Sequence, residues 1–162
     1  MENYYLHKKF FDSKFCSEVI KNYKTNFSYE PRGDWDSWTI SNSQYKKYLL
    51  QEVKNIIPEG IKNSWINLTV YQPGDNLRIH TDKRSEHTIV INLNDDYQGG
   101  DFIIEQENKK LDVGDTLVFN GGTVKHGVRP VLKGIRYSLN YWFTYEDTKV
   151  NLIPYKTKKT IV

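Results

Sequence analysis

Metal-ligand chemistry in this 162-residue chain centres on an imidazole and a carboxylate that lie two positions apart. His80 and Asp82 end a stretch with strand-forming character, so on a β-strand both side chains point to the same face. Imidazole and carboxylate ligands together suit a divalent transition metal. A His-x-Asp pair arises easily by chance, so it indicates a metal site only when a third ligand joins it.

Three further histidines are available as that ligand. His7 lies in the N-terminal segment, and His87 is expected in a surface turn. His126 lies on a predicted late strand, which can run beside an early strand in a sheet sandwich. The hypothesis is therefore that His80, Asp82 and His126 bind the metal as a facial triad; the alternative for His126 is a core histidine bonded to a carbonyl.

Arg136 follows His126 by ten residues and interrupts a strongly apolar strand. A permanent cation is costly to bury unless it is paired, and a carboxylate fits the guanidinium fork in a bidentate manner. Ser138 and Asn140 share its strand face, and Ser138 could donate to the same carboxylate. The alternatives are an arginine paired with an internal Asp or Glu, or an edge-strand arginine that faces water.

Together, these side chains could bind iron and a 2-oxo acid in one site and leave room for dioxygen. A facial triad leaves about three coordination positions open on iron. A 2-oxo acid can take two of them while its far carboxylate reaches Arg136, and dioxygen can take the last. The set favours oxidative decarboxylation of 2-oxoglutarate to succinate and CO2, coupled to hydroxylation of a substrate C–H bond.

The elements that must position these residues change character near residue 60. Asp12 or Ser13 can cap a first helix whose apolar residues recur at three-to-four spacing. A second helix is predicted from about Ser43 to Ile57, where Pro58 ends it. The intervening stretch Phe27–Ser41 is rich in Pro, Gly, Asp and Trp and is predicted to be a loop.

After residue 60, short strand-like segments alternate with turn residues, which is typical of an all-β sandwich or barrel. The predicted strands are Trp65–Tyr71, Leu77–Asp82, Thr88–Leu93, Asp101–Glu105, Lys109–Leu111, Thr116–Phe119, Lys125–Val128 and Ile135–Tyr145. We expect a mainly β jelly roll with two N-terminal helices packed on one outer sheet face. A single domain spanning 1–162 would comprise helical support (1–60), a jelly-roll core (61–146) and a C-terminal tail (147–162).

Composition indicates a folded globular protein, because hydrophobic residues make up 38% and aromatic residues 14% of the chain. The single cysteine, Cys16, excludes an intramolecular disulfide and is expected to be buried. The N-terminus lacks the apolar run of a signal peptide, so a soluble cytoplasmic protein without a membrane partner is expected. The basic cluster Lys156, Lys158 and Lys159 is interpreted as a solvated tail rather than a nucleic-acid or membrane anchor.

Several motifs, in order, resemble those of the prolyl 4-hydroxylase-like branch of the Fe(II)/2-oxoglutarate-dependent dioxygenases. They are Tyr71–Asp82, Thr88–Asn94, Gly99–Phe102, Val113–Phe119, His126–Val131 and Gly134–Trp142. The resemblance implies a double-stranded β-helix (jelly roll), Fe(2+), 2-oxoglutarate, O2 and ascorbate as a reductant. It also implies that Tyr71 contacts 2-oxoglutarate, with Asn92 standing where several relatives have a tyrosine that reaches the distal carboxylate.

The substrate stays open between several hypotheses. The first is hydroxylation of a prolyl residue in a peptide or protein; the others are hydroxylation of a free amino acid or small metabolite, and a non-catalytic cupin-like binding module. The His126-to-Arg136 spacing and the net charge of +3 argue against nucleic-acid dealkylation. Trp35 and Trp38 could form a lid or could simply pack; Arg78 and Lys83 could meet an acidic substrate or water. The oligomeric state is open.

Overall fold

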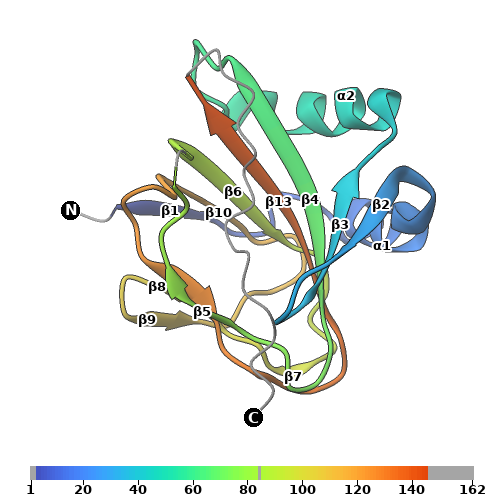
Figure 1. Cartoon of the computed structure of the whole chain (residues 1–162), viewed down its shortest axis with the longest axis vertical. Helices are drawn as coiled ribbons and strands as arrows, with labels where there is room; N and C mark the ends of the chain where they lie inside the picture. The colour runs from blue at the N-terminus through green and yellow to red at the C-terminus, as the bar shows by residue number, and fades with distance from the viewer. Residues whose placement is uncertain (1–2, 84, 146–162) are drawn as a thin grey trace.

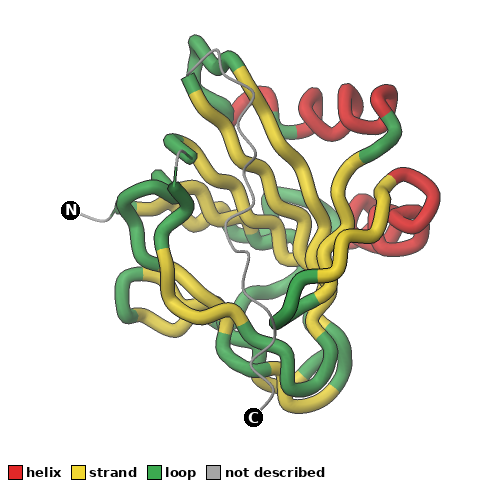
Figure 2. Tube along the Cα trace, in the orientation of Figure 1, coloured by secondary structure: helices red, strands yellow, loops and turns green. Residues whose placement is uncertain are grey.

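The computed structural model describes residues 3–83 and 85–145, which form two facing sheets with helices outside the larger one (Figures 1 and 2). The strands are β1 (Tyr4–His7), β2 (Phe27–Pro31), β3 (Asp36–Ile40), β4 (Asn63–Tyr71), β5 (Leu77–His80), β6 (His87–Asn92), β7 (Gln98–Gly99), β8 (Phe102–Ile104), β9 (Glu107–Lys109), β10 (Thr116–Phe119), β11 (His126–Val128), β12 (Val131–Lys133) and β13 (Arg136–Thr144). The larger sheet has the order β1-β10-β6-β13-β4-β3-β2, the smaller β5-β11-β8-β9, and β12 pairs with β7. The predicted jelly roll with two helices is confirmed.

The first helix, α1 (Ser13–Asn26), begins as predicted. The side chain of Asp12 accepts a hydrogen bond from the backbone N–H of Phe15 at 2.8 Å, which satisfies one of the helix's unpaired donors. Cys16 lies on the covered face of α1 and is fully buried, as expected, and burial raises the pKa of its thiol to about 11.

The second helix, α2 (Ser43–Glu52), ends earlier than predicted. Val53 leaves the α-helical conformation, and a short 3-10 helix, Lys54–Ile56, follows. Ile57 is then extended. Its position before Pro58 explains this conformation, because the proline ring disfavours a helical backbone at the preceding residue.

The prediction of a loop over Phe27–Ser41 is wrong, because this segment forms the β2–β3 hairpin. β3 pairs with the edge of β4, with Trp38 opposite Leu68, and β2 pairs with β3. Cross-strand partners supplied by β4 therefore override a composition that reads as loop. Pro31 and Gly33 lie at the end of β2 and in the turn, where they do not interrupt the pairing with β4.

The strands predicted after residue 60 are present with small shifts at their ends, except that one is displaced, and three further strands were not predicted. β9 begins two residues before the predicted Lys109–Leu111, because Glu105 and Gln106 make a tight turn with φ values of 48° and 70°. β1, which pairs with β10 at the sheet edge, was not predicted. Neither were β7 and β12, which pair with each other.

Alternation along the central strand β13 separates the two faces of the larger sheet. Leu139, Tyr141 and Phe143 point to the helices and join a core that includes residues of α1 and α2. Arg136 and Trp142, by contrast, line a pocket between the two sheets. The prediction that the helices cover one sheet face is confirmed.

None of the described helices is long and apolar enough to cross a membrane. The predicted tail 147–162, with its cluster Lys156, Lys158 and Lys159, lies outside the described residues. The division of the chain into three segments stays a prediction.

Candidate metal centre and co-substrate pocket

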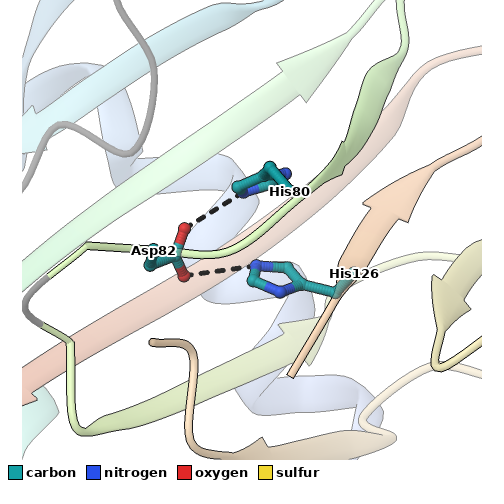
Figure 3. A group of neighbouring side chains, drawn as sticks. All are labelled: His80, Asp82 and His126. Carbon is teal, nitrogen blue, oxygen red and sulfur yellow. Dashed lines mark hydrogen bonds and ion pairs between the residues drawn. The ribbon is translucent and has the colours of Figure 1, made fainter. Parts of the chain in front are cut away.

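The three predicted ligands come together at one end of the smaller sheet. His80 ends β5 and is the direct cross-strand partner of His126, which begins β11. Asp82 follows β5 by two residues. Ligand atoms from all three residues lie within 4.8 Å of one another, and the side chains converge on Asp82 (Figure 3).

Hydrogen bonds fix how the two imidazoles face the carboxylate. Nδ1 of His80 lies 2.8 Å from the carbonyl oxygen of Arg78, and Nδ1 of His126 lies 2.9 Å from that of Val124. A carbonyl only accepts, so each Nδ1 carries the proton, which in the neutral imidazole leaves the Nε2 lone pair for a metal. The Nε2 atoms lie 3.0 and 3.2 Å from the carboxylate oxygens of Asp82. Two lone pairs and a carboxylate that converge in this way fit a divalent cation.

Asp82 is held in its ionised form although it is almost completely buried. Burial by itself raises the pKa of Asp82, but hydrogen bonds that His126 and His80 donate when their Nε2 atoms are protonated outweigh this effect and leave the pKa well below its usual value. A metal cation bound by the same Nε2 atoms would take the place of these protons. Nε1 of Trp142 also donates to Oδ2 of Asp82 at 3.0 Å. An ionised carboxylate is the form that binds metal.

Two neighbours of Asp82 were missed by the sequence reasoning. Trp142 shares the strand face of Arg136, so alternation along β13 was the signal that could have identified it. Gly121 has a steric role: a Cβ there would lie 2.8 Å from Oδ2 of Asp82 and 2.3 Å from the hydroxyl of Thr88. That role depends on tertiary contacts and leaves no local signal in the sequence.

Arg136 is a buried cation with unsatisfied donors. It is 1% exposed, and its Nε and Nη2 atoms have no hydrogen-bond partner among the described residues. Its guanidinium lies 5.3 Å from the ring centre of Tyr71, a cation–π contact that leaves the N–H groups unpaired. Buried unpaired donors are costly, so this site fits a ligand carboxylate, such as the distal carboxylate of 2-oxoglutarate.

Tyr71 and Ser138 line the same pocket as Arg136. Their contact with the co-substrate stays a prediction. Burial raises the pKa of Tyr71 to about 12, although Arg136 opposes the shift, so the hydroxyl stays protonated and can donate. The Ser138 hydroxyl donates to Oδ1 of Asn140 at 2.7 Å. A ligand carboxylate would therefore have to compete with Asn140 for that proton.

Asn92 is not brought to the pocket. Its side-chain amide donates to the backbone carbonyls of Asn94, Leu111 and Asp112 at 2.8–3.3 Å. These bonds hold two chain turns together and use the donors that a carboxylate would need. The side chain thus has a structural role, which the family position alone does not reveal.

Of four further candidate residues, one lines the pocket and three lie elsewhere. His87 begins β6 rather than occupying the predicted surface turn; it is half-buried, its Nε2 lies 3.0 Å from the carbonyl oxygen of Ile56, and burial lowers its pKa. Of the two tryptophans, Trp35 lines the pocket and Trp38 packs against Tyr23 of α1. Lys83 is exposed.

A jelly roll that places a His-Asp-His set beside a buried arginine has the architecture of a non-haem Fe(II) oxygenase. Residues 66–144 match the model of the 2OG-Fe(II) oxygenase superfamily, and this region of the chain belongs to that superfamily. Membership implies Fe(2+), 2-oxoglutarate and O2, and the donor set and Arg136 fit the first two. The use of ascorbate stays a prediction.

Curated relatives are similar over about half of the chain. A PKHD-type hydroxylase of Delftia acidovorans is 34% identical over 74 residues, which is 43% of this chain and 31% of the relative. Another, from Pseudomonas putida, is 37% identical over 82 residues, or 48% of this chain and 35% of the relative. The matches span about a third of the length of these relatives.

Solved structures share the fold over most of the chain. A prolyl-4-hydroxylase from Pseudomonas putida superposes with a TM-score of 0.68 at 18% identity, covering 90% of this chain and 94% of its own. The viral collagen prolyl hydroxylase from Paramecium Bursaria Chlorella virus-1, in its 2OG complex, gives a TM-score of 0.67 at 15% identity, covering 90% and 97%. The likeness confirms the prolyl 4-hydroxylase-like fold.

Proposed function

We propose that this protein is an Fe(II)- and 2-oxoglutarate-dependent dioxygenase that hydroxylates a C–H bond of a prolyl residue in a peptide or protein. The observation that carries the proposal is Arg136, which has two donor atoms without a partner among the described residues and lines the pocket that also holds His80, Asp82 and His126. The pocket thus combines ligands for a metal with an arginine for a carboxylate. A 2-oxo acid that binds the metal at one end and the arginine at the other requires both.

The chain's own residues would bind, orient and shield the reactants. The three ligands hold the iron on one side, and Trp142 fixes the carboxylate of Asp82 through its indole N–H. Arg136 would receive the far carboxylate of 2-oxoglutarate, with the ring of Tyr71 against its guanidinium. When bound, iron, 2-oxoglutarate and dioxygen supply the oxidation of the substrate C–H bond and yield succinate and CO2.

The prolyl assignment is supported by the names of the relatives, which are PKHD-type hydroxylases and prolyl hydroxylases. Aromatic side chains line the same pocket as the metal ligands and suit the apolar ring of a prolyl residue; they are Trp35, Tyr71, Phe102 and Trp142. A panel of proline peptides and free amino acids tests this assignment through succinate release by the Fe(II)-loaded protein. Stimulation by peptides supports it; stimulation by free amino acids alone would contradict it.

Arg136→Gln tests the co-substrate site. Because a hydrogen bond to a charged group contributes about 1.5–3 kcal/mol, we expect the KM for 2-oxoglutarate to rise roughly 10- to 100-fold. Fe(II) affinity should change less than about twofold, since Arg136 is not a ligand. The matched control is Arg129→Gln, an exposed arginine whose Nε donates to Asn108 outside the pocket. Equal losses of iron and 2-oxoglutarate binding would instead identify Arg136 as a structural residue.

A further inference from the structure

A second arginine, Arg32, lines the same pocket, and it enters from outside the region that matches the superfamily model. It lies just after β2, at the turn of the β2–β3 hairpin. Figure 1 shows this hairpin at one edge of the larger sheet, with its turn directed toward the smaller sheet. The pocket therefore has a cation at its hairpin wall in addition to Arg136.

The hairpin holds Arg32 in place through its neighbours. Trp35 is 4% exposed and stacks on Tyr71 with ring centres 6.3 Å apart. Farther along β3, the hydroxyl of Ser37 accepts a hydrogen bond from Asn67 of β4 at 3.0 Å. Arg32 is thus presented by a paired and packed strand element, which suits a residue that must recognise a ligand in a defined position.

The guanidinium of Arg32 is more buried than its ionic partner. Its side chain is 13% exposed, whereas that of Glu30, to which Nη2 donates at 2.9 Å, is 43% exposed. Burial lowers the pKa of Arg32 and Glu30 only partly opposes this shift. A solvent-exposed partner holds a cation weakly, and one carboxylate oxygen uses few of the five guanidinium donors. Arg32 can therefore bind another anion inside the pocket.

The balance of charges in the pocket indicates that this anion comes from neither the metal site nor the co-substrate. Apart from the two histidines, the charged side chains of the pocket are Asp82, Arg136 and Arg32. If Fe(2+) and doubly charged 2-oxoglutarate bind as proposed above, their charges cancel, and those of Asp82 and Arg136 cancel as well. Arg32 then remains as the pocket cation whose counter-charge among the described residues, Glu30, is a more exposed carboxylate that does not line the pocket.

We propose that Arg32 is a specificity-determining residue that binds a carboxylate of the substrate close to the hydroxylated carbon. The inference rests on the proposed function, because that function assigns Arg136 to the co-substrate. Two sources supply the same chemistry: an acidic side chain next to the target residue of a peptide, or the α-carboxylate of a free amino acid. Arg32 recognises either in the bidentate manner typical of guanidinium groups.

The proposal is tested with pairs of probes that differ only in whether they carry a carboxylate or the corresponding amide. The peptide arm compares N-acetyl-Ala-Pro-Glu-amide with its Gln analogue, and the amino-acid arm compares L-proline with L-prolinamide. Binding to the full chain loaded with Mn(II) and 2-oxoglutarate is measured by calorimetry, which needs no turnover. The wild type should bind the carboxylate probe of one arm roughly 10- to 100-fold more tightly than its amide, the value of a charge-assisted hydrogen bond.

Arg32→Gln should reduce this ratio to below about threefold while leaving the affinity for 2-oxoglutarate and Mn(II) unchanged. Arg32→Lys, which keeps the charge but not the fork, should retain an intermediate ratio. Arg129→Gln is the control for loss of a surface arginine and should keep the full ratio. A preference in the peptide arm alone identifies an acidic peptide, and one in the amino-acid arm alone identifies an α-carboxylate.

Three results would overturn the assignment of Arg32. The wild type could show no preference in either arm, the preference could survive in Arg32→Gln, or that variant could lose 2-oxoglutarate affinity to the same degree. Failure of the proposed function has a different signature: the Fe(II)-loaded wild type would release no succinate from 2-oxoglutarate. The binding ratios still report on Arg32 in that case, so the two failures are distinguishable.

Discussion

The two faces of the seven-stranded sheet are built from the same strands and are buried to a similar degree, yet their chemistry is opposite. Leu68 and Leu139 on the helix-covered face are 0% exposed. Thr69 and Ser138, their neighbours in sequence, are 5% and 2% exposed on the pocket face. Apolar burial stabilises the fold, whereas polar burial costs free energy unless hydrogen bonds offset it. One face therefore supplies stability and the other supplies binding groups.

Hydrogen bonds among its own side chains satisfy most of the pocket face. Asn140 donates to Asn67 at 3.0 Å and to Thr69 at 3.3 Å, and it accepts from Ser138. Arg136 on the same face departs from this pattern, since two of its donors have no partner among residues 3–83 and 85–145. The hydroxyl of Thr39 also lacks a partner within the part of the chain that the structure describes, but Thr39 does not line the pocket and carries no charge. The contrast teaches that a buried cation with unsatisfied donors at a pocket wall marks the position of an anionic ligand.

The largest expected effect comes from removing a metal ligand on the smaller sheet, opposite the pocket face. His126→Ala should lower Fe(II) affinity by more than roughly 100-fold, because even residues that only support a ligand contribute 10- to 100-fold. Succinate release should disappear with it. Isothermal titration with Fe(II) under anaerobic conditions measures the change.

The matched control is His87→Ala, which removes an imidazole that contacts Ile56 at the helix side. It should retain Fe(II) affinity within about threefold, well short of the 10-fold effect of a supporting residue. If both variants lost iron equally, the assignment of His126 as a ligand would be wrong.

Truncating a side chain on the helix-covered face should lower stability but leave Fe(II) affinity intact. Leu139→Ala should lower the free energy of unfolding by about 3 kcal/mol, because it leaves a cavity in a fully buried core. Urea denaturation in the presence of a chelator measures this loss without a contribution from metal. Fe(II) affinity of the folded variant should stay within about twofold; a loss as large as that of His126→Ala would show that the two faces are not independent.

A smaller effect is expected from Trp142→Phe, which keeps the ring on the pocket face but deletes the hydrogen bond to Asp82. Fe(II) affinity should fall roughly 10-fold, the low end for a residue that orients a ligand. Trp38→Phe, on the helix-covered face, is the control and should leave metal affinity unchanged. Unchanged affinity in Trp142→Phe would mean that Asp82 is positioned by the histidines alone.

The smallest effect is a pH dependence of stability due to His87. Burial lowers its pKa in the folded protein, whereas the unfolded side chain takes up a proton near pH 6.5. Its contribution to stability is therefore complete above about pH 6.5 and is lost as the pH falls toward the folded pKa. Urea denaturation of the chelated protein at pH 7.5 and 5.5 should show a smaller pH difference in His87→Gln than in the wild type. Equal differences would contradict this assignment.

The sequence predicted those parts of the molecule that depend on local pattern. The capping of α1 by Asp12 and the strand Thr116–Phe119 follow from spacing and turn residues, and both are confirmed. The proximity of His80 and His126 was predicted because a late strand can run beside an early one in a jelly roll, and it is confirmed. Spacing within a strand also placed Arg136 and Ser138 on one face.

What the sequence did not predict depends on partners far along the chain. The β2–β3 hairpin exists because β4 offers an edge. The end of α2 at Glu52, before the predicted Ile57, is a local exception for which spacing gave no signal. Asn92 was placed in the pocket by analogy, but its donors bind turns whose shape no spacing rule describes. Alternation along β13 could have placed Trp142 on the pocket face, but its hydrogen bond to Asp82 depends on a contact between residues 60 positions apart.

The pairing of His80 with His126 across β5 and β11 has a consequence for the folding equilibrium. A slip of one residue between two strands turns every side chain to the other face, so one register alone assembles the donor set. A cation that binds only that register stabilises it by mass action, by about 2.7 kcal/mol at a free concentration 100 times the Kd. Hydrogen exchange of the β5 and β11 amides should therefore slow as metal is added, so that iron supply also governs how long the smaller sheet stays intact.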